Sequence, residues 1–214
     1  TVFAFVDNGD LLEVLPGERD SLILSGEFAP QLDQSQGNIV LQALAAVEHR
    51  APWTVLLDKR LPVAAGLGGG SADAGAVFRL IERAQGLPGS WRARAALLGA
   101  DVPACVESRT CIGLGTGTEL APLTDDLAGM PVLLVNPRLP LSTGPVFRAW
   151  DGVDRGPLPR GTAREIALDG RNDLEAPAMS LWPGSTYSGL RDTTSHSRTV
   201  PSLLPDASHL PSVL

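Results

Sequence analysis

The residues best suited to chemistry lie at 62–76, where four glycines stand directly before a run of very small residues. Glycine tolerates positive φ and carries no Cβ, so successive backbone N–H groups can converge on one anion. A helix that begins here adds roughly half a positive charge at the same point. Ser71 can cap that helix or offer its hydroxyl to a phosphate or a metal-bound water, and these roles compete. The stretch predicts a phosphate-binding loop; the alternative is a mobile glycine turn before a capped helix.

Two common phosphate motifs fit this stretch less well. The Gly-x-x-x-x-Gly-Lys-Ser/Thr loop requires a lysine directly before its hydroxyl residue, and Gly70 occupies that position before Ser71. The dinucleotide fingerprint is nearly matched by Gly66, Gly68 and Ser71. It also needs an acidic residue at the end of the next strand, about 20 residues on, and none is evident there. Neither motif therefore accounts for the loop.

The surrounding sequence predicts the elements that position the loop. Four stretches are expected to form strands, at 1–6, 11–15, 21–25 and 53–57. Asn38 is expected to cap a helix, and the loop to open another at about 71–84. A further helix is predicted at 91–98, and 102–112 is predicted to be extended because it is rich in Val, Ile, Cys and Thr. The loop thus belongs to a strand, loop and helix unit.

A polar stretch at 124–129 is the expected domain boundary, and 131–135 after it is a predicted buried strand. We expect an α+β fold with two domains. Residues 1–125 would form the glycine-loop domain, and 130–179 the start of a smaller domain of sheet and helices. Residues 180–214 are dense in Ser, Thr and Pro, and we expect a disordered tail there.

Composition bounds the possible partners. The net charge of −7 and the isoelectric point near 4.9 argue against binding to nucleic acid or to an anionic membrane, which needs clustered Lys and Arg. The two cysteines, Cys105 and Cys111, are too few for a disulfide framework or a four-ligand zinc site. The sequence shows neither a long apolar run nor a signal peptide, so a cytoplasmic enzyme is expected.

The segment from Pro62 to Ala72 resembles the phosphate loop of the galactokinase, homoserine kinase, mevalonate kinase and phosphomevalonate kinase (GHMP) superfamily. That pattern, Pro-x-x-x-Gly-Leu-Gly-x-x-Ser-Ser/Ala, is matched throughout. Three further segments, in order along the chain, resemble the branch that phosphorylates a cytidine-diphosphate-linked methylerythritol on the non-mevalonate isoprenoid route. They are Leu98-Gly99-Ala100-Asp101-Val102-Pro103, Asn136-Pro137 with Ser142, Thr143 and Phe147, and Gly170-Arg171-Asn172-Asp173-Leu174-Glu175. The likeness extends from Thr1 to about Met179.

The resemblance implies a two-domain GHMP fold that binds ATP with Mg²⁺. It implies that the nucleotide phosphates lie on the loop, whose residues are Pro62, Val63, Ala64, Ala65, Gly66, Leu67, Gly68, Gly69, Gly70, Ser71 and Ala72. Asn38 and Lys59 would lie near the adenine side. Ser71 is the possible metal contact, through a water molecule.

The resemblance also implies the substrate side. Asp101 would be the catalytic carboxylate, which accepts or orients the proton of the attacking hydroxyl; the alternative is an ordinary turn Asp after Gly99. Asp101 and Thr143 would contact the substrate. Phe147 would stack on the cytosine, and its alternative is a buried Phe that packs the second domain.

The expected function is ATP-dependent phosphorylation of the free 2-hydroxyl of that cytidine-linked substrate. The family's N-terminal strand with its Lys, and its Tyr-His pair at the cytidine site, have no counterpart before Thr1. Its Gly-Ser/Thr-Gly segment is absent from 180–214, a change that a shifted reading frame would explain. Two alternatives stay open: a truncated product that binds nucleotide without catalysis, and a sister kinase for another small alcohol.

Overall fold

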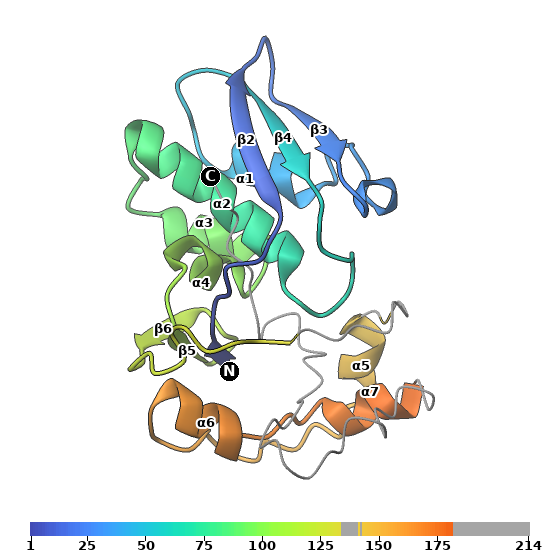
Figure 1. The fold of residues 1–214 in the computed structure, drawn as a ribbon, viewed down its shortest axis with the longest axis vertical. Coiled ribbons are helices and arrows are strands. Elements are labelled where there is room, and N and C mark those ends of the chain that lie inside the picture. Colours follow the sequence, from blue (N-terminus) through green and yellow to red (C-terminus); the bar gives the residue numbers. More distant parts are fainter. Residues whose placement is uncertain (134–140, 142, 182–214) are drawn as a thin grey trace.

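The computed structural model describes residues 1–133, 141 and 143–181. The helices and strands of this part are β1 (Val2–Phe3), β2 (Leu11–Pro16), β3 (Ser21–Ser25), the short 3-10 helix η1 (Ala29–Gln31), α1 (Ile39–Ala46), β4 (Trp53–Asp58), α2 (Gly69–Gln85), α3 (Trp91–Leu98), α4 (Val102–Glu107), β5 (Cys111–Leu114), β6 (Glu119–Pro122), α5 (Thr143–Ala149), α6 (Ala163–Asp169) and α7 (Glu175–Leu181). Figure 1 shows β2, β3 and β4 with α1 and α2 in its upper part, and α5, α6 and α7 in its lower part. The fold is α+β, as the sequence predicts.

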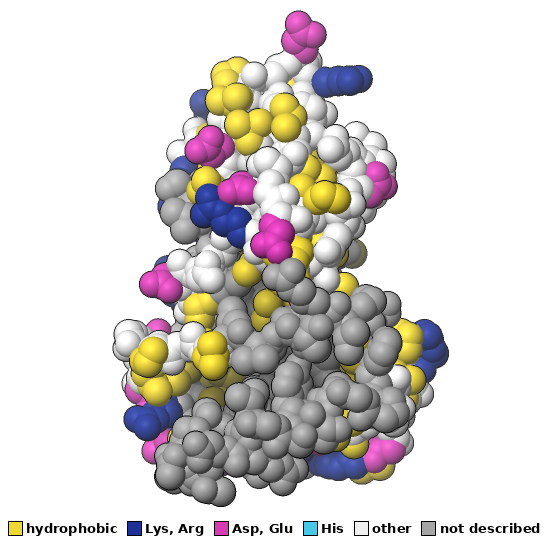
Figure 2. All heavy atoms as spheres, turned by 45° about the vertical axis from the view of Figure 1, so that its right-hand side comes forward, with side chains coloured by type: hydrophobic (Ala, Val, Ile, Leu, Met, Phe, Trp, Pro, Cys, Tyr) yellow, Lys and Arg dark blue, Asp and Glu magenta, His cyan; other side chains and the backbone are white. Residues whose placement is uncertain are grey.

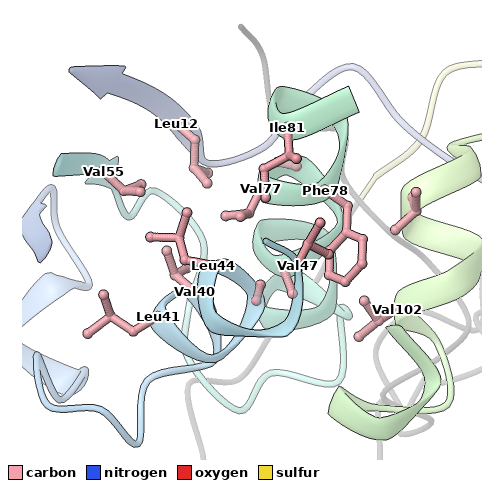
Figure 3. Close-up of a cluster of buried hydrophobic side chains, with 14 of the residues drawn as sticks. Leu12, Val40, Leu41, Leu44, Val47, Val55, Val77, Phe78, Ile81 and Val102 are labelled. Atoms are coloured by element: carbon pink, nitrogen blue, oxygen red, sulfur yellow. The ribbon is translucent and has the colours of Figure 1, made fainter. Parts of the chain in front are cut away.

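The first sheet has the order β2-β4-β3, with β4 at its centre. Strand β4 pairs antiparallel with β2 and parallel with β3. Side chains alternate between the faces of a strand, so Val55 and Leu57 point into the core on one face. Helices α1 and α2 contribute Leu44, Val77 and Phe78 to the same core (Figure 3). Full burial of each such side chain contributes about 1.5–3 kcal/mol, which fixes α2 and the end of β4 relative to each other.

The second sheet has the order β1-β5-β6 and is antiparallel throughout. Val2 pairs with Ile112 and Phe3 with Cys111, so the first residues of the chain meet residues that follow α4. Phe3 is fully buried and packs in a small cluster with Ala104 and Cys111. This cluster joins the N-terminal segment to α4.

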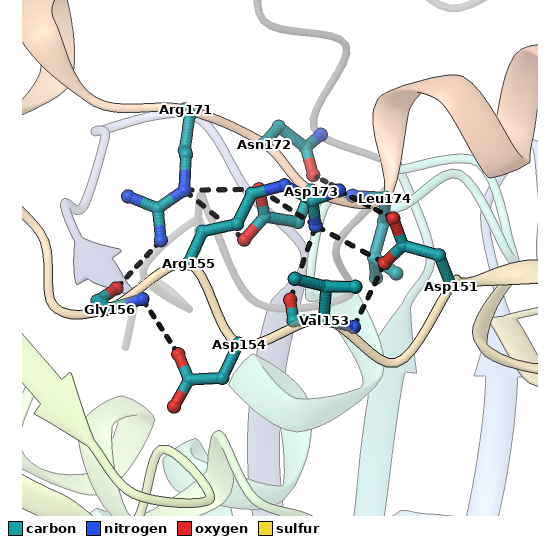
Figure 4. Close-up of polar contacts among 9 residues, drawn as sticks. All are labelled: Asp151, Val153, Asp154, Arg155, Gly156, Arg171, Asn172, Asp173 and Leu174. Carbon is teal, nitrogen blue, oxygen red and sulfur yellow. Dashed lines mark hydrogen bonds and ion pairs between the residues drawn. The ribbon is translucent and has the colours of Figure 1, made fainter.

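The lower helices are held by a small apolar cluster and by polar contacts. Val146 of α5 packs with Leu174 and Ala178 at α7. In the chain before α7, Arg171 binds Asp173, and the Asn172 side chain accepts the backbone N–H of Leu174 at 3.0 Å (Figure 4). The segment that resembles the family's Asn-Asp-Leu-Glu element therefore forms the turn that opens α7.

The surface in Figure 2 shows acidic and basic side chains interspersed over the described face. This mixture agrees with the absence of a clustered basic stripe in the sequence, which carries a net charge of −7. Among the described helices, none combines the length and apolar composition that a membrane crossing requires.

Several predicted elements are confirmed. The strand at 21–25 and the helix at 91–98 have the predicted bounds, and β4 is one residue longer than expected. The helix that follows the glycine loop begins at Gly69 rather than at Ser71. The prediction for 1–6 was too long, because only Val2–Phe3 forms a strand.

The extended segment predicted at 102–112 is wrong over its first half, which forms α4. Pro103 lies in the first turn of that helix, where its missing N–H is not needed. Val102 and Val106 lie one turn apart and are both buried, so the packing of one helical face overrides their strand propensity. Only Cys111–Leu114 is extended, as β5.

The buried strand predicted at 131–135 is not found in its described half. Residues 131–133 have no regular structure, and Leu133 is 79 % exposed. Residues 134–135 lie outside the described part of the chain, as do Asn136, Pro137 and Ser142. Of the predicted tail, Ser180 and Leu181 belong to α7, and the remainder lies outside the described residues. The division into two domains stays a prediction.

Candidate active site

A pocket of about 540 Å³ opens at the N-terminal end of α2. It is lined by Leu32, Asp33, Gly37, Asn38, Ile39, Leu57, Lys59, Pro62, Val63, Ala64, Ala65, Gly66, Leu67, Gly68, Gly69, Gly70, Ser71, Asp73, Leu141 and Thr143. The structure thus brings Asn38, Lys59 and the loop from Pro62 to Ser71 together around one space. Ala72 is buried in α2 behind this wall.

Along the loop, residues with a positive φ alternate with residues that do not have one. Ala64, Gly66 and Gly68 have φ of 54°, 70° and 68°, so every second residue is left-handed. Such alternation turns neighbouring N–H groups toward one concave side, which suits an anion. At the start of α2, Gly69, Gly70 and Ser71 have no carbonyl one turn earlier in the helix to bind. Loop and helix together have the backbone geometry that a phosphate cradle needs, and phosphate binding there stays a prediction; we refer to residues 64–70 as the phosphate cradle.

Ser71 does not cap the helix. The N-cap of α2 is Gly68, and no side chain supplies the capping hydrogen bond. Ser71 is the third residue of α2 and lines the pocket. The capping role predicted for Ser71 is therefore wrong. Its other predicted role, contact with a phosphate or a metal-bound water, stays a prediction.

Asn38 caps α1 as predicted. Its Oδ1 accepts the backbone N–H of Val40 at 2.9 Å, and its Nδ2 donates to the Asp33 carbonyl at 2.7 Å. These two bonds fix the side chain at the edge of the pocket. Asn38 therefore lines the pocket from the start of α1, and its place near the adenine of a nucleotide stays a prediction.

Lys59 lies directly after β4 and forms ion pairs with two acidic residues that the sequence reasoning missed, Asp10 and Asp73. The three side chains are 3 %, 2 % and 2 % exposed, respectively. Lys59 Nζ donates to Asp10 Oδ2 and, at 2.9 Å, to Asp73 Oδ2. We call Asp10, Lys59 and Asp73 the charge triad. It lies against the first turns of α2 and contributes Lys59 and Asp73 to the pocket wall.

For both Asp73 and Lys59, burial shifts the pKa in one direction and the opposite charge beside the group shifts it in the other. Burial raises the pKa of Asp73 to about 7, with repulsion from Asp10 adding to it and the Lys59 charge opposing it. Burial lowers the pKa of Lys59, but the charges of Asp73 and Asp10 outweigh burial, and the net shift is upward. Lys59 therefore stays protonated, held between the two carboxyl groups.

Asp101 is 3 % exposed and occupies the N-cap position of α4, although its side chain does not cap the helix. It is not among the described residues that line the pocket. The turn before it lies beside the loop, since a Cβ built on Gly99 would be 3.9 Å from Ser71 Oγ. Asp101 is thus held close behind the phosphate cradle by the packing of α4 on α2.

Two residues of α5, Thr143 and Phe147, are predicted to contact the substrate, and only Thr143 lines the pocket. Thr143, the first residue of α5, lines the pocket. Phe147 does not line it and is 49 % exposed, so the alternative of a buried core Phe is wrong. Phe147 is thus half exposed, and its stacking role stays a prediction.

In this α+β fold, a glycine-rich loop between β4 and α2 forms one wall of a pocket, which agrees with the resemblance of the sequence to the GHMP kinases. The sequence profile described as "GHMP kinases N terminal domain" matches residues 38–109. The chain is 66 % identical over 195 residues to the 4-diphosphocytidyl-2-C-methyl-D-erythritol kinase of Novosphingobium aromaticivorans, covering 90 % of this chain and 68 % of the relative. It is 57 % identical over 187 residues to the kinase of the same name in Erythrobacter litoralis, covering 86 % and 68 %.

A solved structure titled "Crystal structure of 4-(cytidine 5'-diphospho)-2C-methyl-D-erythritol kinase" is similar with a TM-score of 0.58 and 32 % identity. The match covers 81 % of this chain and 65 % of that one. The chain belongs to the 4-diphosphocytidyl-2-C-methyl-D-erythritol kinase family. It spans about two thirds of the length of the relatives that it matches.

Proposed function

We propose that the chain transfers the γ-phosphoryl group of ATP to the free 2-hydroxyl of 4-diphosphocytidyl-2-C-methyl-D-erythritol, in the synthesis of isoprenoid precursors without mevalonate. The observation that carries the proposal is the pocket itself, in which the phosphate cradle faces Thr143 from α5. The proposed donor site and the proposed acceptor side would thus share one space. The name of relatives up to 66 % identical supports the same substrate.

Backbone groups supply most of the proposed nucleotide binding. The loop offers converging N–H groups, and the N-terminus of α2 adds its partial positive charge to them. Such a cradle binds a polyphosphate even in a protein with a net charge of −7, because it needs no basic patch. The nucleotide phosphates would therefore lie over Gly68, Gly69 and Gly70.

Magnesium fits this site as a companion of the nucleotide rather than as a resident ion. Within the described ranges, no group of three or more His, Cys, Asp or Glu side chains could hold a metal. Mg²⁺ keeps several waters and binds substrate phosphates with one or two protein groups, so a dedicated cage is not needed. The Ser71 hydroxyl would hold one of those waters. The ion neutralises charge on the phosphates as they transfer.

Asp101 is proposed to position the acceptor hydroxyl and to receive its proton. Phosphoryl transfer is largely dissociative, so orientation and charge stabilisation matter more than a strong base. A fixed carboxylate still contributes roughly 10²-fold or more. Burial of Asp101 beside the Gly99 turn suits this role, because a buried carboxylate at the start of a packed helix has little freedom to move.

We further propose that the enzyme acts in the cytoplasm on a small molecule, with no nucleic-acid or membrane partner. The acidic net charge and the interspersed charges of the surface support this proposal. A sister kinase for another small alcohol is the competing assignment. Such a kinase would differ in the residues that bind the acceptor alcohol and not in the phosphate loop.

The proposal is tested on the 214-residue chain by coupled ADP release with the cytidine-linked substrate, together with calorimetry of Mg-ATP binding. We expect Asp101→Asn to lower kcat at least about 100-fold while the nucleotide Kd stays unchanged. Asp125→Asn, which alters an exposed turn carboxylate, is the matched control and should keep full activity.

The possible results of these measurements separate the competing hypotheses. A fully active Asp101→Asn variant removes the role of Asp101. Nucleotide binding without substrate-dependent turnover in the wild type supports the silent, binding-only alternative. If Mg-ATP produces no heat of binding, the nucleotide site itself is refuted. Equal turnover of a plain alcohol favours the sister-kinase assignment.

A further inference from the structure

Asp10 lies far from the glycine loop in sequence but holds the residues that lead into it. Its Oδ1 accepts the backbone N–H groups of Arg60 and Leu61 at 2.7 and 2.9 Å. Its Oδ2 accepts Lys59 Nζ. One buried carboxylate thus binds three consecutive residues, the last three before Pro62. Asp10 itself does not line the pocket.

The partner of Asp10 on the pocket side is the Lys59 ammonium. An ammonium has three N–H donors, and within the charge triad Asp10 and Asp73 take two of them. Lys59 lines the pocket, so the two carboxylates determine where its remaining donor points. Without Asp10, the side chain would keep Asp73 as its single anchor.

The ammonium is also packed against the start of α2. A Cβ built on Gly69 would lie 3.2 Å from Lys59 Nζ and 3.5 Å from Asp10 Oδ2. Gly69 is the first residue of α2 and part of the phosphate cradle. The absence of a side chain at Gly69 therefore lets the charge triad touch the backbone that would bind the nucleotide.

We propose that Asp10 is a positioning residue of the nucleotide site, which acts through Lys59 and through the backbone that leads into the phosphate loop. The carboxylate orients the Lys59 ammonium toward a bound nucleoside polyphosphate and fixes the start of the loop at Arg60 and Leu61. The inference rests on the proposed function, because it requires a nucleotide in the pocket.

This role predicts an effect on binding rather than on the chemical step. Asp101 is the N-cap residue of α4 and makes none of the contacts described for Asp10, so positioning of the acceptor hydroxyl should not depend on Asp10. Replacement by Asn keeps an oxygen for the two backbone N–H groups but removes the negative charge beside Lys59. Replacement by Ala removes both.

The experiment measures Mg-ADP affinity by calorimetry at a temperature at which every variant is folded. We expect Asp10→Asn to raise the Kd at least about tenfold and Asp10→Ala to raise it further, with KM for ATP following the Kd and kcat changing less than about threefold. Asp20→Asn is the matched control, since Asp20 accepts the N–H of Trp53 at the opposite end of β4. It should leave the Kd unchanged.

A double-mutant cycle with Lys59→Gln tests whether Asp10 acts through Lys59. We expect Asp10→Asn to have much less effect in the Lys59→Gln background, and Lys59→Met, which also removes the charge, replaces that variant if it does not fold. If Asp10→Asn raises the Kd by the same factor in the Lys59→Gln background as in the wild type, action through Lys59 is refuted. A lower melting temperature with an unchanged Kd reduces Asp10 to a structural residue and overturns the inference. Failure of the wild type to bind Mg-ADP instead overturns the proposed function, and the inference with it.

Discussion

Ala64 is a non-glycine residue in the left-handed part of the phosphate loop, with φ of 54°. That conformation brings Cβ too close to the following carbonyl and costs an L-residue roughly 1–2 kcal/mol. Gly66 and Gly68 adopt similar angles without this penalty. The strain at Ala64 is therefore a local cost of the alternating backbone that forms the cradle.

Ala64→Gly should stabilise the protein by up to about 1 kcal/mol, because relief of strain outweighs the greater freedom of glycine in the unfolded chain. Urea denaturation measures the effect. Ala65→Gly is the matched control, since Ala65 is the neighbouring loop residue and does not have positive φ; it should be neutral or destabilising. If both variants lose stability equally, the left-handed angle carries no strain.

His49 makes stability depend on pH near neutrality. Its two ring nitrogens lie 3.0 Å from the Val47 carbonyl and 3.0 Å from Asp20 Oδ1, and both partners accept. Only the protonated ring donates from both nitrogens. Burial lowers the pKa of His49, but the Val47 carbonyl and Asp20 outweigh burial and raise the pKa above its ordinary value of 6.5.

Because the folded pKa is raised, the stabilisation from His49 is complete below pH 6.5 and is lost as pH rises through the folded value. Between about pH 5.5 and pH 8.5, the melting temperature of the wild type should fall roughly 2 °C more than that of His49→Gln. Thermal melts at a series of pH values check this. Parallel curves for the two proteins would contradict the assignment.

At the scale of elements, the phosphate cradle and Asp101 are connected by the contact of α2 with α4. A Cβ built on Gly75 of α2 would lie 2.7 Å from both the carbonyl carbon and the Cβ of Cys105. The Arg79 side chain donates to the Cys105 carbonyl from the next turn of α2. The close approach at Gly75 thus sets how far α4, and Asp101 at its start, stand from the loop.

Gly75→Ala should destabilise the protein by about 1–3 kcal/mol, because the added methyl group meets backbone that cannot move aside. It should also lower kcat more than it raises the nucleotide Kd, since α4 shifts and the loop does not. Gly89→Ala is the control, because nothing lies within 4 Å of the Cβ position at Gly89. A kcat equal to that of the wild type would show that Asp101 does not depend on this contact.

The elements that sequence predicted well are those whose signals are local. The helix at 91–98 ends at a glycine, and β3 is a short apolar run between polar residues. The structure differs from the prediction at α4, where valines that favour strands are buried against α2. That choice depends on a partner surface, which a local pattern does not contain.

The residues of the candidate site also divide into those with a local sequence signal and those whose role depends on a distant partner. The glycine loop and the cap at Asn38 are recognisable from spacing alone, and the pocket contains both. Asp10 has no local signal in the sequence that marks it as a site residue, because its partner Lys59 is 49 residues away. Asp73 lies in a run of small residues that suggests only close packing. An acidic residue among small residues, two positions after Ser71, was the signal that could have prompted a search for its cation.

At the scale of the whole molecule, the pocket joins two stretches of chain. The loop supplies one wall, and Leu141 and Thr143 supply part of another. Phe147 follows one turn later on α5, with about half of its surface exposed. The specificity of the enzyme should therefore depend on the lower part of the molecule, and nucleotide binding on the upper part.

Phe147→Ala should raise KM for the cytidine-linked substrate roughly tenfold, since stacking of a base on an aromatic ring contributes about 1–3 kcal/mol. The KM for ATP should not change. Steady-state kinetics with each substrate varied in turn measures both values, and Phe147→Trp, which keeps a ring, should retain activity. If Phe147→Ala leaves both KM values unchanged, the ring does not contact the base.

The pairing of β1 with β5 also has a consequence for how the protein is made. Val2 meets Ile112, a partner about 110 residues later in the chain. At a synthesis rate of roughly 5–20 residues per second, the ribosome needs about 5–20 s to produce that partner. Throughout this interval the ring of Phe3 has no sheet to enter. The nascent β1 segment is therefore expected to need protection by chaperones until translation has passed β5.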